Sequence, residues 1–201
     1  VGVGANTGRL DEGENPKWNG ITTPLLLPNG LLARRYKKWG WTDCYSTKQI
    51  TGAPQMKVVA PEHPIFAGID TTNLLDILDP DVGSGVTTFL VDIPNMGNGT
   101  LLAETVGDVS TAWIAEWQAG VEYYDGSGEF AGGPRMMFVA GTQDRHGGDP
   151  VGILNLTDEG KQLFLNAIEY MLPPAAPSMV AHWPMDDGAG TVVADVVGGN
   201  D

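Results

Sequence analysis

The segment from Thr157 to Pro174 constrains the fold of this chain most strongly. Thr157 is a good helix N-cap, and Asp158 and Glu159 follow where the helix dipole favours acidic side chains. Apolar residues then recur at helical spacing and make one stripe: Leu163, Phe164, Ala167, Ile168 and Met171. Two prolines stop the helix. The sequence therefore predicts an amphipathic helix near residues 158–172 that packs on a core and closes a domain.

The middle of the chain predicts a sheet of short strands. Apolar runs alternate with turn residues, for example at 95–99 and 125–128. The expected strands are 21–27, 57–60, 86–91, 100–103, 111–116 and 136–140. The last of these is continuously apolar, which suits a strand covered on both faces, as in an α/β sheet. Residues 1–20 are expected as a loop, and 31–41 as a short helix or an irregular segment.

A proline-rich stretch divides the chain. Residues 173–178 indicate a stiff linker, so residues 1–172 predict one α/β domain. Residues 179–201 predict the start of a second, β-rich domain, with strands over 179–183 and 191–197. The first residues lack both an initiator methionine and a signal-peptide pattern, and the last ones indicate the middle of a turn. We therefore expect a fragment of a larger protein.

The acidity of the chain restricts its partners. Its 201 residues include 25 acidic and 11 basic side chains, for a net charge of −14. This charge repels phosphate backbones and anionic lipids, so we expect no binding of nucleic acid. No apolar run approaches the roughly 20 residues that span a bilayer, so no membrane insertion is expected. Cys44 is the only cysteine, which excludes an intrachain disulfide.

The residues after the linker resemble a known family. The run from Val180 to Thr191, VAHWPMDDGAGT, and the later Asp195 and Asn200 are similar to the opening of a laminin-G-like, concanavalin A-like jelly-roll domain. Such domains bind carbohydrates or proteins in exported bacterial proteins. The resemblance implies glycans as partners and an extracellular or cell-surface location. It also implies Ca²⁺ as a cofactor of the intact domain, with Asp186, Asp195 and Asn200 as candidate ligands.

Residues 20–172 resemble the later part of a class I glutamine amidotransferase-like domain, of the flavodoxin-like type that also occurs in trehalose-utilisation-type proteins. The similarity is carried by the run HPIFAGI from His63, by the strand at 113–115, by residues 133–141 and by the closing helix. The resemblance implies a flavodoxin-like fold whose first βα units are missing from this chain.

The family's activity needs a cysteine on a tight turn between a strand and a helix. Here that turn is Pro28-Asn29-Gly30, and Asn29 cannot attack a carbonyl carbon. We therefore expect a non-catalytic module, structural or ligand-binding, without a cofactor of its own and with other domains of the same chain as neighbours.

Three residues keep an enzymatic alternative open. His146 follows an expected strand end, where α/β sheets bind ligands, and Asp144 lies beside it. With nearby carboxylates, His146 is the candidate centre of a hydrolase acting on a sugar or an amide; a solvated loop histidine is the plainer interpretation. Cys44 is a candidate displaced nucleophile, although a lone cysteine is more often a small buried hydrophobe.

Aromatic side chains supply candidate ligand contacts. Trp117 and Tyr124 are candidates for stacking on sugar rings, with core packing as the alternative. Glu116, Glu122 and Asp125 are close enough in sequence to form a carboxylate pair for glycoside hydrolysis, but closeness means little in so acidic a chain.

Overall fold

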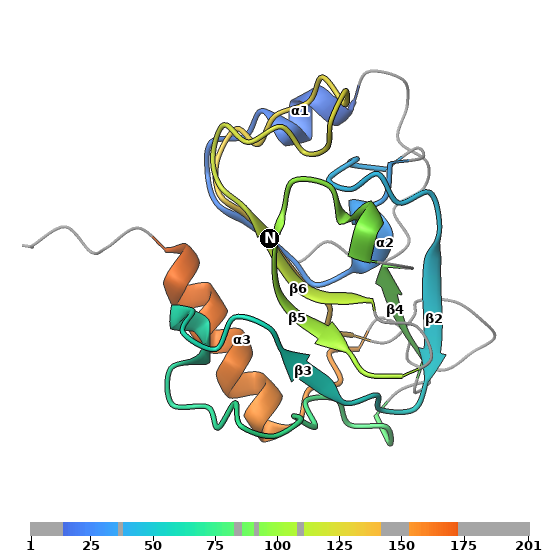
Figure 1. Cartoon of the computed structure of the whole chain (residues 1–201), viewed down its shortest axis with the longest axis vertical. Coiled ribbons are helices and arrows are strands. Elements are labelled where there is room, and N and C mark those ends of the chain that lie inside the picture. The colour runs from blue at the N-terminus through green and yellow to red at the C-terminus, as the bar shows by residue number, and fades with distance from the viewer. Residues whose placement is uncertain are drawn as a thin grey trace, which may run out of the picture.

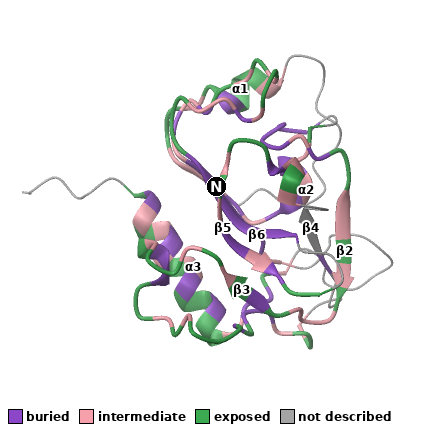
Figure 2. Ribbon diagram, viewed as in Figure 1, coloured by how far each residue is buried: buried purple, intermediate pink, exposed green. Residues whose placement is uncertain are grey.

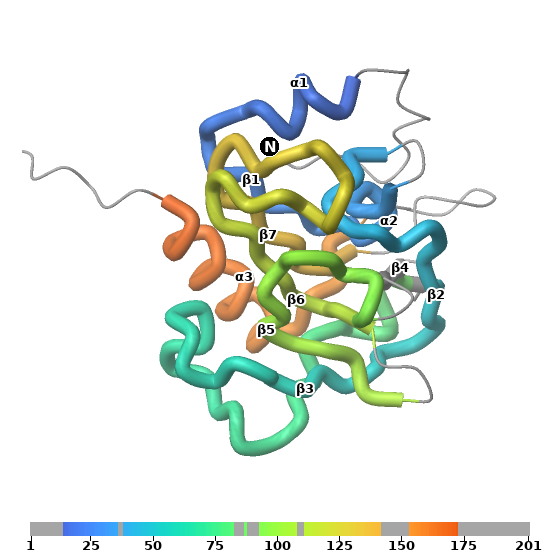
Figure 3. The backbone as a smooth tube through the Cα atoms, turned by 45° about the horizontal axis from the view of Figure 1, so that its top comes forward, coloured from blue at the N-terminus to red at the C-terminus, as the bar shows by residue number. Residues whose placement is uncertain are grey.

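The computed structural model describes residues 14–35, 38–82, 86–90, 93–107, 111–141 and 153–172. Five strands form one mixed sheet, which runs in the order β1 (Leu25–Leu27), β7 (Arg135–Phe138), β6 (Ala112–Trp117), β5 (Thr100–Thr105) and β3 (Met56–Val58) (Figure 3). β1 is parallel to β7, and the other neighbours are antiparallel. A separate antiparallel pair consists of β2 (Thr47–Thr51) and β4 (Val86–Leu90).

Helices and the small strand pair cover the two sides of this sheet. The long helix α3 (Asp158–Met171) lies on one side, together with the 3₁₀ turn η1 (Pro64–Phe66) (Figure 1). The short helix α2 (Gly30–Ala33) and the β2–β4 pair lie on the other side. α1 (Asn15–Asn19) and the turn η2 (Ile93–Met96) complete the described elements.

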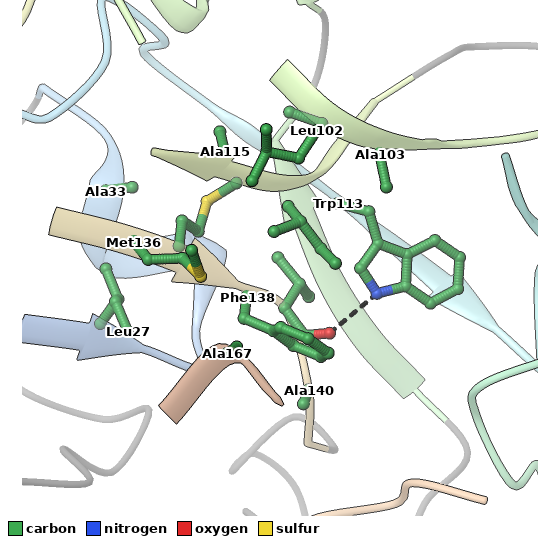
Figure 4. Close-up of a cluster of buried hydrophobic side chains, with 14 of the residues drawn as sticks. Leu27, Ala33, Leu102, Ala103, Trp113, Ala115, Met136, Phe138, Ala140 and Ala167 are labelled. Carbon is green, nitrogen blue, oxygen red and sulfur yellow. Dashed lines mark hydrogen bonds between the residues drawn. The ribbon is translucent and has the colours of Figure 1, made fainter. Parts of the chain in front are cut away.

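The core lies between these layers. All six residues of β6 are buried, as are the four of β7 (Figure 2). Leu27, Met136 and Phe138 from the sheet gather with Ala167 of α3 (Figure 4). The indole Nε1 of Trp113 donates to the Val139 carbonyl at 2.9 Å, which satisfies the one polar atom of that buried ring.

α3 begins where the sequence predicts. The Thr157 hydroxyl accepts from the Gly160 amide at 3.1 Å and donates to the Asp76 carbonyl at 3.0 Å. Gly160 lets the helix approach the preceding segment closely, because a Cβ there would lie 2.3 Å from the Ile77 carbonyl oxygen. The first turn of α3 is thus fixed both by its cap and by contact with residues 76–77.

A buried arginine attaches the N-terminal segment to the sheet. Arg135, at the start of β7, is fully buried, and its guanidinium donates to the carbonyls of Asn19, Ile21, Thr23 and Pro134. A charge removed from water is tolerated only with such partners. Gly133 permits the close approach, since a Cβ there would lie 2.0 Å from the Thr22 oxygen. Residues 19–23 therefore run tightly against 132–135.

Most of the predicted elements are confirmed, and the α/β class holds as a mixed sheet with few helices. The helix over 158–172 is confirmed as α3, and the strands expected over 57–60, 86–91, 100–103, 111–116 and 136–140 correspond to β3, β4, β5, β6 and β7. The linker at 173–178 and the jelly-roll start at 179–201 lie outside the described residues.

Two sequence predictions were incomplete, and one strand was not predicted. The strand over 21–27 is limited to 25–27, because the carbonyls of Ile21 and Thr23 bind Arg135 and Pro24 has no amide hydrogen. The expected loop 1–20 contains α1, and β2 was not predicted.

Among the described residues, no helix has the length and apolar character needed to cross a membrane.

Candidate ligand-binding edge of the sheet

The parallel pair β1 and β7 brings two chain segments to one edge of the sheet. The carboxyl end of β1 continues into Pro28, and that of β7 continues into Ala140, whose amide donates to the Pro28 carbonyl at 3.0 Å. In open α/β sheets, ligands bind outside the carboxyl ends of the strands. This edge of the sheet is therefore the candidate ligand-binding site.

Asn29 occupies the turn between β1 and α2, as expected from the sequence. Its backbone is extended, with φ −136° and ψ 108°, and its Oδ1 accepts from the Leu31 amide at 2.9 Å to cap the helix. Its Nδ2 is buried and has no hydrogen-bonding partner among the described residues. A carboxamide in this role positions the helix and offers a donor, but it is not a nucleophile.

Asn155 closes the same edge from another segment. Its Oδ1 accepts from the Gly141 amide at 3.0 Å, and its Nδ2 donates to the Thr87 hydroxyl at 3.4 Å. Both Asn155 and Thr87 are buried. No sequence pattern indicates this role, because Asn155 and Thr87 are 68 residues apart and neither belongs to a recognisable motif.

The structure places Cys44 in the core. Its exposed fraction is 1%, and its thiol donates to the Ser46 carbonyl. The nitrogens of His63 are directed instead at the Ile65 amide and the Glu116 carboxylate. Cys44 and His63 therefore do not form a nucleophile–base pair here, and the interpretation of Cys44 as a small buried hydrophobe fits its position.

Of the two alternatives for Trp117, its position fits core packing. Its exposed fraction is 1%, and its ring packs with Trp41 and Tyr123 at centroid distances of 5.8 and 6.3 Å. The indole also covers Gly99, where a Cβ would lie 2.5 Å from the ring. Strand β6 is buried on both faces, so Trp117 has no ring face left for a sugar.

Tyr124 is only partly buried and packs against the core. Burial and the nearby Asp43 carboxylate raise the pKa of its phenol. Its ligand contact remains a prediction.

The three candidate carboxylates have separate structural roles. Oε2 of Glu116 accepts from the Tyr170 hydroxyl at 3.1 Å. Oε1 of Glu122 accepts from the Gly128 amide at 3.0 Å, and Oδ1 of Asp125 accepts from the Asn98 side chain at 3.2 Å. Glu122 and Asp125 thus stabilise the turn that follows β6, as the chemistry of turn residues predicts.

The remaining candidates lie outside the described residues: His146, Asp144, Asp186, Asp195 and Asn200. Within the described ranges, no three His, Cys, Asp or Glu side chains are grouped as metal ligands.

The sequence did not predict the contacts of His63 with Glu116 and Tyr170, because they join three segments that are distant in the chain. Comparison of the chain with protein-family models, curated proteins and solved structures gives no match.

Proposed function

We propose that residues 1–172 form a non-catalytic module of the amidotransferase-like, flavodoxin-like type. It serves as a structural or ligand-binding unit of a larger exported protein. A lectin-like jelly-roll domain, which binds glycans and holds Ca²⁺, begins after the linker at 173–178.

One observation carries the non-catalytic assignment. The turn between β1 and α2 holds Asn29, whose side chain caps α2 through Leu31. A nucleophile elbow presents a reactive side chain on a strained backbone, whereas Asn29 has an ordinary extended conformation. The chain's only thiol, on Cys44, is buried and donates a hydrogen bond to the Ser46 carbonyl.

The charge of the chain and the resemblance support the rest of the proposal. A net charge of −14 is compatible with neutral, hydroxyl-rich ligands and with cations. The exported location and the glycan partner follow from the similarity of residues 180–201 to the lectin-like family.

The competing function is a hydrolase centred on His146. The test uses the full-length protein, a panel of chromogenic glycosides and amides, and the variants His146→Ala and Cys44→Ser. We expect no turnover of the panel above background in any of the three proteins. A hydrolysis that is present in the parent protein and abolished by His146→Ala would overturn the non-catalytic assignment.

A second experiment tests the glycan-binding part. The full-length protein and a version that ends at residue 172 are compared on a glycan array, with and without a calcium chelator. We expect binding by the full-length protein only, and loss of that binding in the chelator. Glycan binding by the shorter version would place the glycan site within residues 1–172. It would contradict the proposal that the jelly-roll domain binds the glycan.

A further inference from the structure

A buried carboxylate in the central strand needs an explanation. Glu116 is 8% exposed, and every other residue of β6 is buried and uncharged. Burying a carboxylate is costly unless partners compensate for the lost water. Two other segments supply them: Oε2 accepts from Tyr170 of α3, and Oε1 lies 3.4 Å from Nε2 of His63.

The contacts of His63 define its tautomer. Nδ1 accepts from the Ile65 amide at 3.4 Å and thereby caps η1, so Nδ1 must carry a lone pair. The proton of a neutral imidazole then belongs to Nε2, which lies 3.4 Å from Glu116 Oε1 without hydrogen-bond geometry in this state. The Tyr170 ring packs against the imidazole edge to face, at a centroid distance of 4.6 Å.

A second proton on this imidazole can only go to Nδ1. It would turn the cap acceptor into a donor that faces the Ile65 N–H, and it would give Nε2–H a full charge opposite Glu116. Protonation therefore strengthens the attraction to Glu116 and removes the cap of η1. Among the described residues, the ionisable groups that face His63 are the carboxylate of Glu116 from β6 and the phenol of Tyr170 from α3, while Glu62 precedes it in its own segment.

We propose that His63 is a proton-operated latch between η1 and the sheet. The neutral imidazole caps η1 and contacts Glu116, whereas the protonated imidazole keeps Glu116 and releases the cap. Burial and the charge of Glu116 raise the pKa of Tyr170, so its hydroxyl remains a donor to Glu116 in both states.

Releasing the cap reaches the contact between η1 and α3. The side-chain amide of Asn166 in α3 donates to the carbonyls of Ile65 and Ala67, both at 2.9 Å. The buried side chains of Ile65 and Phe66 lie in the same turn. Proton uptake at His63 therefore loosens η1, the turn to which Asn166 of α3 is bound. Tyr170, near the end of α3, stays bound to Glu116.

Hydrogen exchange of the Ile65 amide tests the latch on the 201-residue chain. After correction for intrinsic exchange, we expect protection of this amide to fall about five- to tenfold between about pH 8 and pH 5. The matched control is His63→Asn, because an asparagine oxygen accepts the same amide, as Asn29 does for Leu31, and does not titrate. In this variant, protection of the Ile65 amide should not change over the same pH range.

An equal fall in both proteins, or no fall in the parent protein, would overturn the latch. A second measurement needs no variant. Nitrogen-15 spectra of the imidazole at high pH should report the Nε2-protonated tautomer of His63, and the Nδ1-protonated tautomer would contradict the proposal.

Discussion

At the scale of single residues, Gly97 and Gly126 form a natural pair. Both have a left-handed backbone, with φ +77° and +78°. A Cβ on Gly97 would lie 2.4 Å from the Tyr123 carbonyl oxygen, whereas a Cβ on Gly126 would have no atom within 4 Å. The pair therefore separates the cost of backbone strain from the cost of a clash with neighbouring atoms.

We expect Gly126→Ala to lower the free energy of unfolding by about 1 kcal/mol, from backbone strain alone. Gly97→Ala should lower it by about 3 kcal/mol, because displacement of residues 123–124 is added to the same strain. Urea denaturation of both variants measures the two losses. Equal losses would show that the segment around Tyr123 gives way freely.

Tyr123 provides a titration with a clear sign. Burial, which outweighs the opposing charge of Arg135, raises the pKa of its phenol from 10.0 to about 12. The folded protein therefore holds this proton more tightly than the unfolded chain does. The resulting stabilisation is complete below about pH 10 and is lost as the pH rises towards about 12.

Phenolate absorbance during an alkaline titration checks this prediction. In the parent protein, Tyr123 should be the last of the five tyrosines to ionise, later than Tyr124 and Tyr170, whose pKa values are also raised, and its ionisation should accompany unfolding. The variant Tyr123→Phe should lack that late step and keep the others. Complete ionisation of all tyrosines near pH 10 with the fold intact would contradict the raised pKa.

At the scale of elements, the start of α3 depends on Thr157. Its hydroxyl accepts from Gly160 and donates to Asp76. Thr157→Ala removes both bonds and should lower the free energy of unfolding by about 1 kcal/mol, whereas Thr157→Ser should change it by less than about 0.5 kcal/mol. Chemical denaturation measures both, and a serine variant as unstable as the alanine variant would exclude the cap as the cause.

The elements differ in how far the sequence determines them. α3 was predictable because its cap, its stripe and its proline stop are all local features. β2 was not, because its TKQIT sequence has no apolar run and its strand conformation depends on pairing with β4, about 40 residues away. α1 is also held from a distance, since the Asn19 side chain binds the Trp39 carbonyl and the Glu129 carboxylate.

The candidate site follows the same rule: its local parts could be predicted from the sequence, and its long-range contacts could not. The strand, turn and helix around Asn29 are consecutive in the chain, so the absence of a nucleophile at that turn was visible in the sequence. The bond between Glu116 and Tyr170 joins residues 54 apart, and only the packing of α3 on the sheet brings them together. The sequence left the burial of Trp117 open for a related reason, because β6 is covered on both faces and apolar alternation therefore carries no signal there.

At the scale of the whole molecule, Arg135 connects the N-terminal segment to the sheet. Its planar guanidinium directs two nitrogens at four carbonyls, of Asn19, Ile21, Thr23 and Pro134. A lysine ammonium keeps the buried charge but has only three donors on a single atom, so it cannot match this arrangement. Arg35 is the matched control, because its ion pair with Asp43 is roughly half exposed, at 48% and 42%.

We expect Arg135→Lys to lower the free energy of unfolding by about 2–4 kcal/mol, since buried carbonyls lose charged partners. Arg35→Lys should change it by less than about 0.5 kcal/mol. Limited proteolysis adds a structural readout, because in Arg135→Lys the segment before Leu25 should become cleavable while the sheet persists. If the two variants lose the same stability, the N-terminal segment is held by the close packing of Thr22 on Gly133, and the guanidinium is dispensable.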